Sequence, residues 1–516
     1  MEVRFDESPA AAGGIQKERL NLYVNGRRFV AFGGNWGLPE HMLGYRAREY
    51  DIAVGYHKHM NFTMIRNWVG QTGDEEFYEA CDRHGIMVWQ DFWLANPVDG
   101  PNPYNEPMFM ANAADYVRRI RKHPSIALYC GRNEGYPPES LNKQLRETVD
   151  RLSPRSLYFP SSADDGVSGH GPYRALPAAD YFKQQTGKLH SERGMPNMPN
   201  IESLRRMLAP EHLWPQNPYW GKHDFTQKGA QAGATFNQLT YTRFGTGALA
   251  GSKDPAARYA ALAQWQNFDG YRAMYESSNL QRQGLIIWMS HSCWPSMVWQ
   301  TYDYYFDPTA AFFGVKKACE PIHVQYNAAT RQVQMVNLMK GGENVKVTAT
   351  IYDLKGKALW QQNKEFFLRT DSTADCFEVP QPVASQGTCF LRLQALSLHN
   401  HKTLSTNTYM LSATPSQEDL WTVPQARIEV RPALTGYGNE WVVVNTGTAP
   451  ALMVRLNLCA TDGEQILPAY YSENYFHLMP GERMPVSLGW RTQDARGVQP
   501  VLKVSGFNLP EMQVRL

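Results

Sequence analysis

The chain has 516 residues, more than one hydrophobic core ordinarily supports, so two or three domains are expected. Apolar residues make up 43% and charged residues 19%, which is the balance of a folded protein rather than a disordered one. A net charge of only +2 argues against a nucleic-acid partner, and no apolar stretch is long enough to span a bilayer.

Residues 1–19 are interpreted as a lead-in to the first domain. They contain no apolar segment of the kind that a signal peptide needs, so none is expected. The compartment stays undetermined, with a periplasmic or extracellular location open if the N-terminus is truncated. The seven cysteines are scattered, and none forms a C-x-x-C pair. We therefore expect no disulfide framework, no metal site and no cofactor.

Residues 20–322 alternate strand-like and helix-like segments, which predicts a parallel α/β domain, here a (β/α)8 barrel. A helix over Phe109–Ile120 is indicated by apolar residues at helical spacing, and Asn200 is expected to cap another helix. The expected strands are short apolar runs that end in polar or aromatic residues: Phe29–Gly33, Met64–Asn67, Ile86–Trp89, Ile126–Cys130, Leu157–Pro160 and Leu285–Met289.

The pattern changes after Pro321 to alternating strands separated by Gly, Asn and Asp turns. Residues 323–412 are predicted to form a β-sandwich and residues 413–516 a second, immunoglobulin-like one. The segment Thr414–Pro424 resembles a linker between them. Neither module contains a cluster of reactive side chains, so both are interpreted as structural.

Two acidic residues follow apolar runs, where a parallel barrel presents its catalytic groups. Glu134 comes after the run Ile126–Cys130 and before a Gly-Tyr-Pro-Pro turn, a position suited to a general acid. Glu192 ends the short strand around Leu189, and its neighbour Arg193 is expected to keep it ionised as a nucleophile requires. Two carboxylates about 5 Å apart would cleave a glycosidic bond with retention. The alternatives are a surface glutamate opening a loop and a surface Glu192–Arg193 ion pair.

Further candidates for substrate binding also lie at strand ends. Trp36, Trp93 and Trp288 are flat rings suited to stacking on a sugar, although packing at the barrel top explains each equally well. Arg66 is a candidate for orienting the nucleophile or binding hydroxyls, with a structural ion pair as its alternative. Asp91 is a weaker candidate for hydroxyl recognition.

At these residues the chain resembles glycoside hydrolase family 2, in its branch of β-mannosidases, endo-β-mannosidases and exo-β-glucosaminidases. The resemblance covers nearly the whole chain. It is carried by Phe32–Trp36, Met60–Arg66, Gly85–Trp93, His123–Ile126, Asn133–Glu134, Ser191–Glu192, Ile287–Met289, Cys293–Pro295, Trp299–Gln300, Asn445–Gly447, Asn474–Phe476 and Leu478–Glu482.

The resemblance implies that Glu134 is the acid/base, Glu192 the nucleophile, and Asn133 the residue that binds the sugar 2-hydroxyl. It also implies that Arg66 lies under the nucleophile and that Trp288 forms the floor of the −1 subsite, with no metal required. Family members usually carry a jelly-roll and an immunoglobulin-like domain before the barrel, and the printed sequence contains neither. Trp93 is more similar to the mannosidase side of the branch than to the glucosaminidases.

The sequence therefore predicts a retaining β-glycosidase that acts on a glycan, with a β-mannoside favoured. An exo-β-glucosaminidase or β-galactosidase is the alternative among enzymes. A non-catalytic glycan-binding relative is the alternative of another class, although a pure binder has no need for both Glu134 and Glu192. The oligomeric state, the linkage and the choice between exo and endo action stay open.

Overall fold

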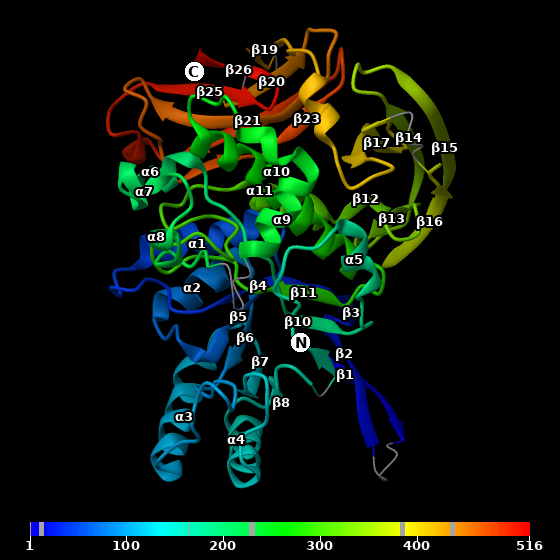
Figure 1. The fold of residues 1–516 in the computed structure, drawn as a ribbon. Coiled ribbons are helices and arrows are strands. Elements are labelled where there is room, and N and C mark those ends of the chain that lie inside the picture. Colours follow the sequence, from blue (N-terminus) through cyan, green and yellow to red (C-terminus); the bar gives the residue numbers. More distant parts are fainter. Residues whose placement is uncertain (1, 10–14, 165, 227–232, 382–386, 434–438) are drawn as a thin grey trace.

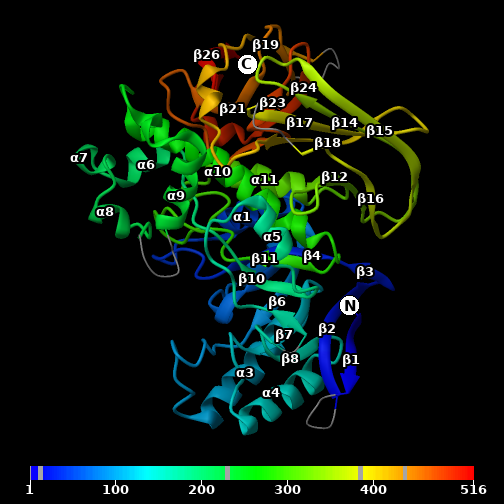
Figure 2. The ribbon, with the colours of Figure 1, turned by 45° about the vertical axis from the view of Figure 1, so that its right-hand side comes forward.

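A computed structural model describes residues 2–9, 15–164, 166–226, 233–381, 387–433 and 439–516. Figure 1 shows a barrel with two β-rich parts on one side of it, and a long helix, α10 (Pro255–Ser278), between them and the barrel strands. The N-terminal strands β1 (Glu2–Pro9) and β2 (Ile15–Val24) pair antiparallel. In both views this hairpin extends on the side away from the two β-rich parts (Figures 1 and 2).

Eight parallel strands form the sheet of the barrel in the order β8-β7-β6-β5-β4-β11-β10-β9. Its outer strands, β8 and β9, follow each other directly in the chain, and just past their ends the Gly169 amide donates to the Ala163 carbonyl at 3.2 Å. The strands are β4 (Ala31–Trp36), β5 (Met64–Asn67), β6 (Met87–Asp91), β7 (Ile126–Arg132), β8 (Leu157–Ser161), β9 (Val167–Ser168), β10 (Leu189–Arg193) and β11 (Gly284–Ile287).

One buried cluster fills the interior of this sheet and takes side chains from every one of the eight strands. A packed interior of alternate, inward-facing residues is the arrangement of a (β/α)8 barrel, and the predicted fold class is confirmed. The eight barrel strands contribute Ala31, Met64, Trp89, Ala127, Leu128, Cys130, Phe159, Val167, Leu189 and Ile286, and β2 adds Leu20 and Leu22.

Helices cover the outside of the barrel, and their ends follow ordinary capping chemistry. Gly85 ends α2 in the left-handed region, and Asp254 caps α10 by accepting from the Ala257 amide. Asn200 occupies the predicted N-cap position of its helix, but its side chain makes no cap hydrogen bond and donates instead to Asp307 at 3.0 Å. The helices other than α10 are α1 (Ala47–His59), α2 (Glu75–His84), α3 (Glu106–Ile120), α4 (Glu139–Leu152), α5 (Ala178–Lys183), α6 (Ile201–Met207), α7 (Pro210–Leu213), α8 (Pro218–Gly221), α9 (Gly233–Phe244) and α11 (Ala310–Ala318).

The remaining strands form two antiparallel sandwiches, as the alternating patterns predict. The first pairs the sheets β12-β13-β16 and β15-β14-β17-β18, and the second pairs β19-β20-β24-β22 and β23-β21-β25-β26. Their strands are β12 (Ile322–Asn327), β13 (Gln332–Asn337), β14 (Glu343–Tyr352), β15 (Ala358–Leu368), β16 (Ser372–Glu378), β17 (Cys389–Ser397), β18 (Thr403–Leu411), β19 (Ile428–Pro432), β20 (Glu440–Asn445), β21 (Ala451–Ala460), β22 (Ala469–Tyr471), β23 (Phe476–Leu478), β24 (Arg483–Trp490), β25 (Pro500–Gly506) and β26 (Leu509–Arg515).

Helix α10 joins the barrel to both sandwiches. Its Trp265 ring packs edge-on against Phe507 of the second sandwich, and its Arg272 donates to Asn407 of the first. The segment Thr414–Pro424, predicted to be a linker, is instead docked. It contains a 3-10 turn (Glu418–Thr422) in which Leu420 is buried, and the Trp421 indole donates to the Phe244 carbonyl 2.8 Å away. The alternating apolar pattern that marks a strand is missing there, so no local pattern indicates this packing.

Candidate active site

The ends of four barrel strands bring the predicted acids and Arg66 to one place. Glu134 follows β7, Glu192 lies in β10, and Arg66 and Asp91 come from β5 and β6. These are the carboxyl ends of parallel strands, where barrel enzymes hold their reactive groups. Glu134 has a φ of 44°, a left-handed conformation that few residues other than glycine adopt. Its backbone amide donates to the Ser162 hydroxyl at 3.0 Å, which fixes this turn.

A tyrosine hydroxyl connects the two acids. The Tyr173 oxygen lies 3.1 Å from Oε1 of Glu134 and 2.7 Å from Oε2 of Glu192. Tyr173 has one hydroxyl hydrogen, so it donates to one carboxylate and accepts from the other, and both contacts are hydrogen bonds only when one acid carries a proton. Burial and the two carboxylates raise the pKa of Tyr173, which keeps that hydrogen in place. The arrangement suits one ionised and one protonated acid.

Tyr173 is held in position by the strand that carries Glu192. It forms a parallel bridge with Gly194, and the Gly194 amide donates to the Pro172 carbonyl at 3.0 Å. The loop between β9 and α5 therefore behaves as an extension of the sheet at this point. Sequence reasoning missed Tyr173, because the stretch from Gly169 to Pro172 is rich in glycine and proline and has no apolar alternation to mark a bridge.

Arg66 organises the floor of the site. It is fully buried and donates from one guanidinium nitrogen to Glu192 Oε1 at 2.7 Å and from another to Asn133 Oδ1 at 2.7 Å. It also pairs with Asp91 at 2.8 Å, in the fork geometry that arginine provides. Burial lowers the pKa of Arg66, but Asp91 and Glu192 outweigh it and raise the pKa above the ordinary value.

Asp91 belongs to this support rather than to a sugar-binding surface. The carboxylate is buried and accepts from Arg66, from the Trp89 indole at 2.8 Å and from the Val69 amide at 3.0 Å. All of its contacts are with the protein beneath the site. The prediction that Asp91 recognises a substrate hydroxyl is therefore wrong for this structure, and a structural ion pair with Arg66 is the observed arrangement.

Burial dominates the electrostatics of Glu192. Loss of solvent raises its pKa to about 7, with Arg66 lowering it and the like charge of Glu134 raising it. Arg193 is not its partner, contrary to the expectation from sequence. The Arg193 guanidinium donates to the Tyr181 carbonyl at 3.2 Å and lies over the Tyr181 ring. Successive side chains of a strand point to opposite faces, so Glu192 and Arg193 cannot share one site.

The aromatic candidates divide into two groups. Trp288 follows β11 directly and its ring lies between Trp68 and Trp299, with centroids 4.8 Å and 5.8 Å away. The Tyr173 ring is also next to Trp299, at 6.2 Å, so Trp288 belongs to the wall beside the two acids. Sequence reasoning missed Trp68, whose loop carries no motif, and it used Trp299 only as part of the family resemblance, without assigning it to the site.

Trp93 and Trp36 have different surroundings. Trp93 is 36% exposed at the rim of the barrel, where its ring packs on Phe109 and Tyr116. Trp36 is 0% exposed and stacks on His291 at 4.1 Å among the helices around the barrel. A ring without exposed area cannot bind a ligand, so the prediction that Trp36 stacks on a sugar does not hold, and the packing alternative is correct.

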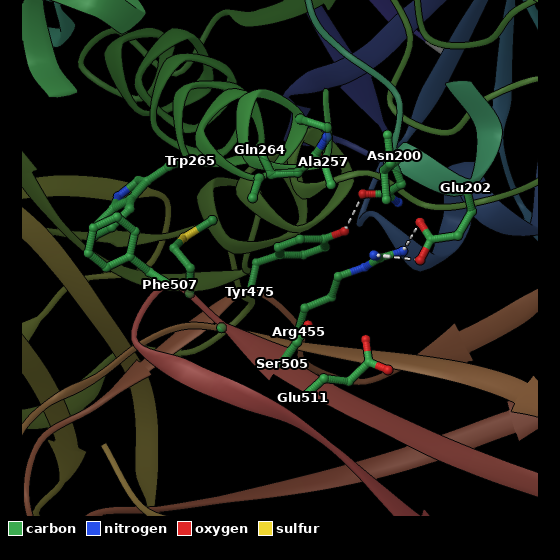
Figure 3. Close-up of a pocket in the computed structure, with 15 residues that line it drawn as sticks. Asn200, Glu202, Ala257, Gln264, Trp265, Arg455, Tyr475, Ser505, Phe507 and Glu511 are labelled. Carbon is green, nitrogen blue, oxygen red and sulfur yellow. Dashed lines mark hydrogen bonds and ion pairs between the residues drawn. The ribbon is translucent and has the colours of Figure 1, made fainter. Parts of the chain in front are cut away.

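A separate cavity of about 200 Å³ lies where the barrel meets the second sandwich (Figure 3). Four of its polar side chains are already paired: Arg455 forms two 3.0 Å contacts with Glu202, and Tyr475 donates to Asn200. Such pairing is typical of a joint between domains, and we assign no chemistry to it. Among the residues that the structure describes, no cluster of His, Cys, Asp and Glu could hold a metal ion, and no helix is suited to crossing a bilayer.

Comparison with known proteins finds relatives in sequence and in fold. Residues 408–509 match the family described as the exo-β-D-glucosaminidase Ig-fold domain. The chain is 26% identical to a mannosylglycoprotein endo-β-mannosidase of Lilium longiflorum, over 95% of this chain and 64% of that protein. It is also 26% identical to an exo-β-D-glucosaminidase of Streptomyces avermitilis, over 95% of this chain and 60% of that protein.

The chain is a homologue of β-mannosidases and exo-β-D-glucosaminidases. This is the branch of glycoside hydrolase family 2 that the motifs resemble. The fold agrees with that of two glycoside hydrolases. The exo-chitosanase of Amycolatopsis orientalis superposes with a TM-score of 0.86 at 21% identity, over 100% of this chain and 66% of the other. The β-D-mannosidase of Dictyoglomus thermophilum gives 0.79 at 21%, over 99% and 63%. The chain spans about three fifths of the length of the curated glycosidases it matches.

Proposed function

We propose that the chain hydrolyses β-linked glycosides with retention of configuration, using Glu192 as nucleophile and Glu134 as general acid/base. The observation that carries the proposal is the Tyr173 hydroxyl, which contacts both carboxylates at once. A site built to hold one protonated and one ionised acid is suited to a reaction that consumes both.

The spacing of the acids supports retention. Because Tyr173 Oη contacts both, Glu134 Oε1 and Glu192 Oε2 are no farther apart than the sum of 3.1 Å and 2.7 Å. Inverting enzymes separate their carboxyl groups by about 6.5 Å or more, to leave room for a water molecule, whereas retaining enzymes keep them at about 5–5.5 Å. The spacing in this chain is on the retaining side of that division.

The reaction then proceeds in two displacements. An oxygen of Glu192 forms a bond to the anomeric carbon while the glycosidic bond breaks, and Glu134 gives its proton to the departing oxygen. Water next attacks the anomeric carbon, Glu134 takes a proton from that water, and the Glu192 ester bond breaks. Arg66 and Tyr173 stabilise the carboxylate of Glu192 when it leaves again, through the contacts described above.

A β-mannoside is the favoured substrate. A β-glucosaminide carries a 2-amino group, which a carboxylate in the site could bind as an ammonium. At the end of β6, Asp91 is fully engaged by Arg66, Trp89 and the Val69 amide, so it cannot take this role. The names of the homologues support β-mannosides and β-glucosaminides alike. An exo-β-glucosaminidase is therefore the second candidate among enzymes, and a glycan-binding protein without turnover the candidate from another class.

The test is release of nitrophenol from β-linked nitrophenyl mannoside, glucosaminide, galactoside and glucuronide. We expect the mannoside to be cleaved fastest, and the anomeric configuration of the first sugar product to be retained by NMR. Glu134→Gln and Glu192→Gln are expected to abolish turnover, whereas Glu147→Gln, an exposed residue of α4, leaves it unchanged. A folded protein that binds these glycosides without cleaving any of them, or a product of inverted configuration, would overturn the proposal.

A further inference from the structure

Loop 94–102, which follows β6, lies directly against the turn that carries Glu134. The Asn133 amide donates to the Leu94 carbonyl at 2.9 Å. A Cβ atom added to Gly135 would come within 2.8 Å of the Pro97 ring, so the two loops touch on both sides of Glu134. The loop is therefore part of the surroundings of the proposed acid, although it contributes neither carboxylate.

Arg132 fixes the shape of this loop. It is the last residue of β7, is only 3% exposed, and donates three hydrogen bonds to the loop. They reach the Ala95 carbonyl at 2.8 Å, the Asn102 side chain at 2.6 Å and the Gly100 carbonyl at 2.9 Å. Burial lowers the pKa of Arg132, which measures the cost of placing a cation there. A buried guanidinium satisfied by loop carbonyls holds that loop in one conformation.

Asn96 connects the loop to the acid. Its side-chain oxygen accepts from the Val98 and Asp99 amides at 2.9 Å and 2.8 Å, which closes an Asx turn. Its amide nitrogen faces Asp99 and, at 3.4 Å, Oε2 of Glu134. The two oxygens of Glu134 thus have different neighbours. Oε1 faces Tyr173 and the nucleophile, and Oε2 faces loop 94–102.

This asymmetry indicates where the two halves of a substrate lie. The sugar that is attacked must be next to Glu192, and the acid donates its proton to the oxygen between that sugar and the leaving group. The leaving group therefore extends past Glu134 on the side away from Glu192, over loop 94–102. Val98 at the loop tip is 94% exposed and Tyr136, two residues after Glu134, is 50% exposed.

We propose that loop 94–102 is the binding site for the leaving group, taken up by a second sugar ring, and that Asn96 is a positioning residue for Glu134. The inference rests on the proposed glycosidase function and adds to it the side and the class of the leaving group. The two loops, which touch at Pro97 and Gly135, carry the polar groups of Asn96 and Asp99 and the exposed side chains of Val98 and Tyr136. Such a mixture suits a sugar, which has hydroxyl edges and apolar faces.

The experiment compares two substrates that differ only in the leaving group. The dinitrophenolate of a 2,4-dinitrophenyl glycoside departs without help from an acid. A β-1,4-linked disaccharide of the same sugar needs protonation of its glycosidic oxygen and a place for its second ring. The sugar is the one selected by the nitrophenyl panel, or mannose if the panel is silent. Asn96→Ala is expected to lose 10- to 100-fold in kcat/KM on the disaccharide and less than threefold on the dinitrophenyl glycoside. Asn112→Ala, an exposed position of α3, is the control and is expected to change neither.

A binding measurement keeps the test independent of turnover. In Glu192→Gln, calorimetry should show that the disaccharide binds at least tenfold more tightly than the methyl glycoside, and Asn96→Ala in that background should remove most of this difference. Equal losses on both substrates, no loss on either, or a disaccharide that binds no better than the methyl glycoside would overturn the inference. Failure of the wild type to cleave even the dinitrophenyl glycoside would instead contradict the proposed function.

Discussion

The Tyr173 hydroxyl lies 2.7 Å from Oε2 of Glu192, although the two residues come from different segments at the barrel top. The bridge between Tyr173 and Gly194 brings the loop after β9 alongside the end of β10. Each oxygen of the proposed nucleophile has its own hydrogen-bond partner: Arg66 contacts Oε1 of Glu192 and Tyr173 contacts Oε2. The reactivity of Glu192 therefore depends on residues outside the two acid motifs.

Removing the Tyr173 hydroxyl tests this dependence. In Tyr173→Phe the ring and its packing on Trp299 are kept, and one hydrogen bond to a charged group is lost. Such a bond contributes about 1.5–3 kcal/mol, so kcat is expected to fall by about 10- to 150-fold. Tyr241→Phe, on the outer helix α9, is the matched control. A kcat equal to that of the wild type in Tyr173→Phe would mean that the hydroxyl has no part in the reaction.

The role of Glu134 as acid predicts a dependence on the leaving group. In Glu134→Gln, cleavage of a glycoside with a poor leaving group is expected to fall by about 10²- to 10⁴-fold. A dinitrophenyl glycoside should lose far less in its first step, because its leaving group needs no proton. Stopped-flow release of dinitrophenol would then show a burst as the glycosyl-enzyme accumulates. Equal losses on both substrates would exclude Glu134 as the proton donor.

Much of the site could be predicted from sequence, and the part that could not has physical reasons. The strand Met64–Asn67 is observed with its predicted ends, because a buried parallel strand is a short continuous apolar run. Both acids follow such runs, which is how they were found. Tyr173 and Asn96 lie in loops whose course is set by contacts with distant segments, so no local pattern marks them. Trp36 and Arg193 were misassigned because position along a strand does not tell which face a side chain takes.

Glu192 is also expected to make stability depend on pH. Its pKa is raised from 4.5 to about 7 on folding, so its contribution is most favourable below pH 4.5 and is lost as pH rises through 7. The full loss amounts to roughly 3 kcal/mol. Glu192→Gln removes this group, so the Tm of the variant relative to wild type should rise between pH 4.5 and 7.5. Glu147→Gln is the control for an exposed glutamate. A Tm difference that is constant over this range would contradict the raised pKa.

The same pKa should govern the acid side of the rate profile. A nucleophile acts only when ionised, so kcat/KM is expected to fall as pH drops through about 7. Glu134 raises the pKa of Glu192, so in Glu134→Gln the limb should move to lower pH when a dinitrophenyl glycoside is the substrate. An unmoved limb would mean that another group controls it.

Arg66 is expected to move that limb in the opposite direction. Arg66 lowers the pKa of Glu192, and its fork serves Glu192, Asp91 and Asn133 together. In Arg66→Lys a single ammonium replaces the fork and cannot reach all three partners, so Glu192 loses part of its stabilisation and its pKa rises. The limb of kcat/KM should therefore shift to higher pH, and kcat at pH 7 should fall by about tenfold or more. A purely structural role for Arg66 would reduce the amount of folded enzyme without moving the limb, so the pH profile separates the two explanations. If the limb shifts to higher pH in Arg66→Lys and to lower pH in Glu134→Gln, Glu192 is the titrating group. Arg66 lowers the pKa of Glu192 and Glu134 raises it, so their removal has opposite effects.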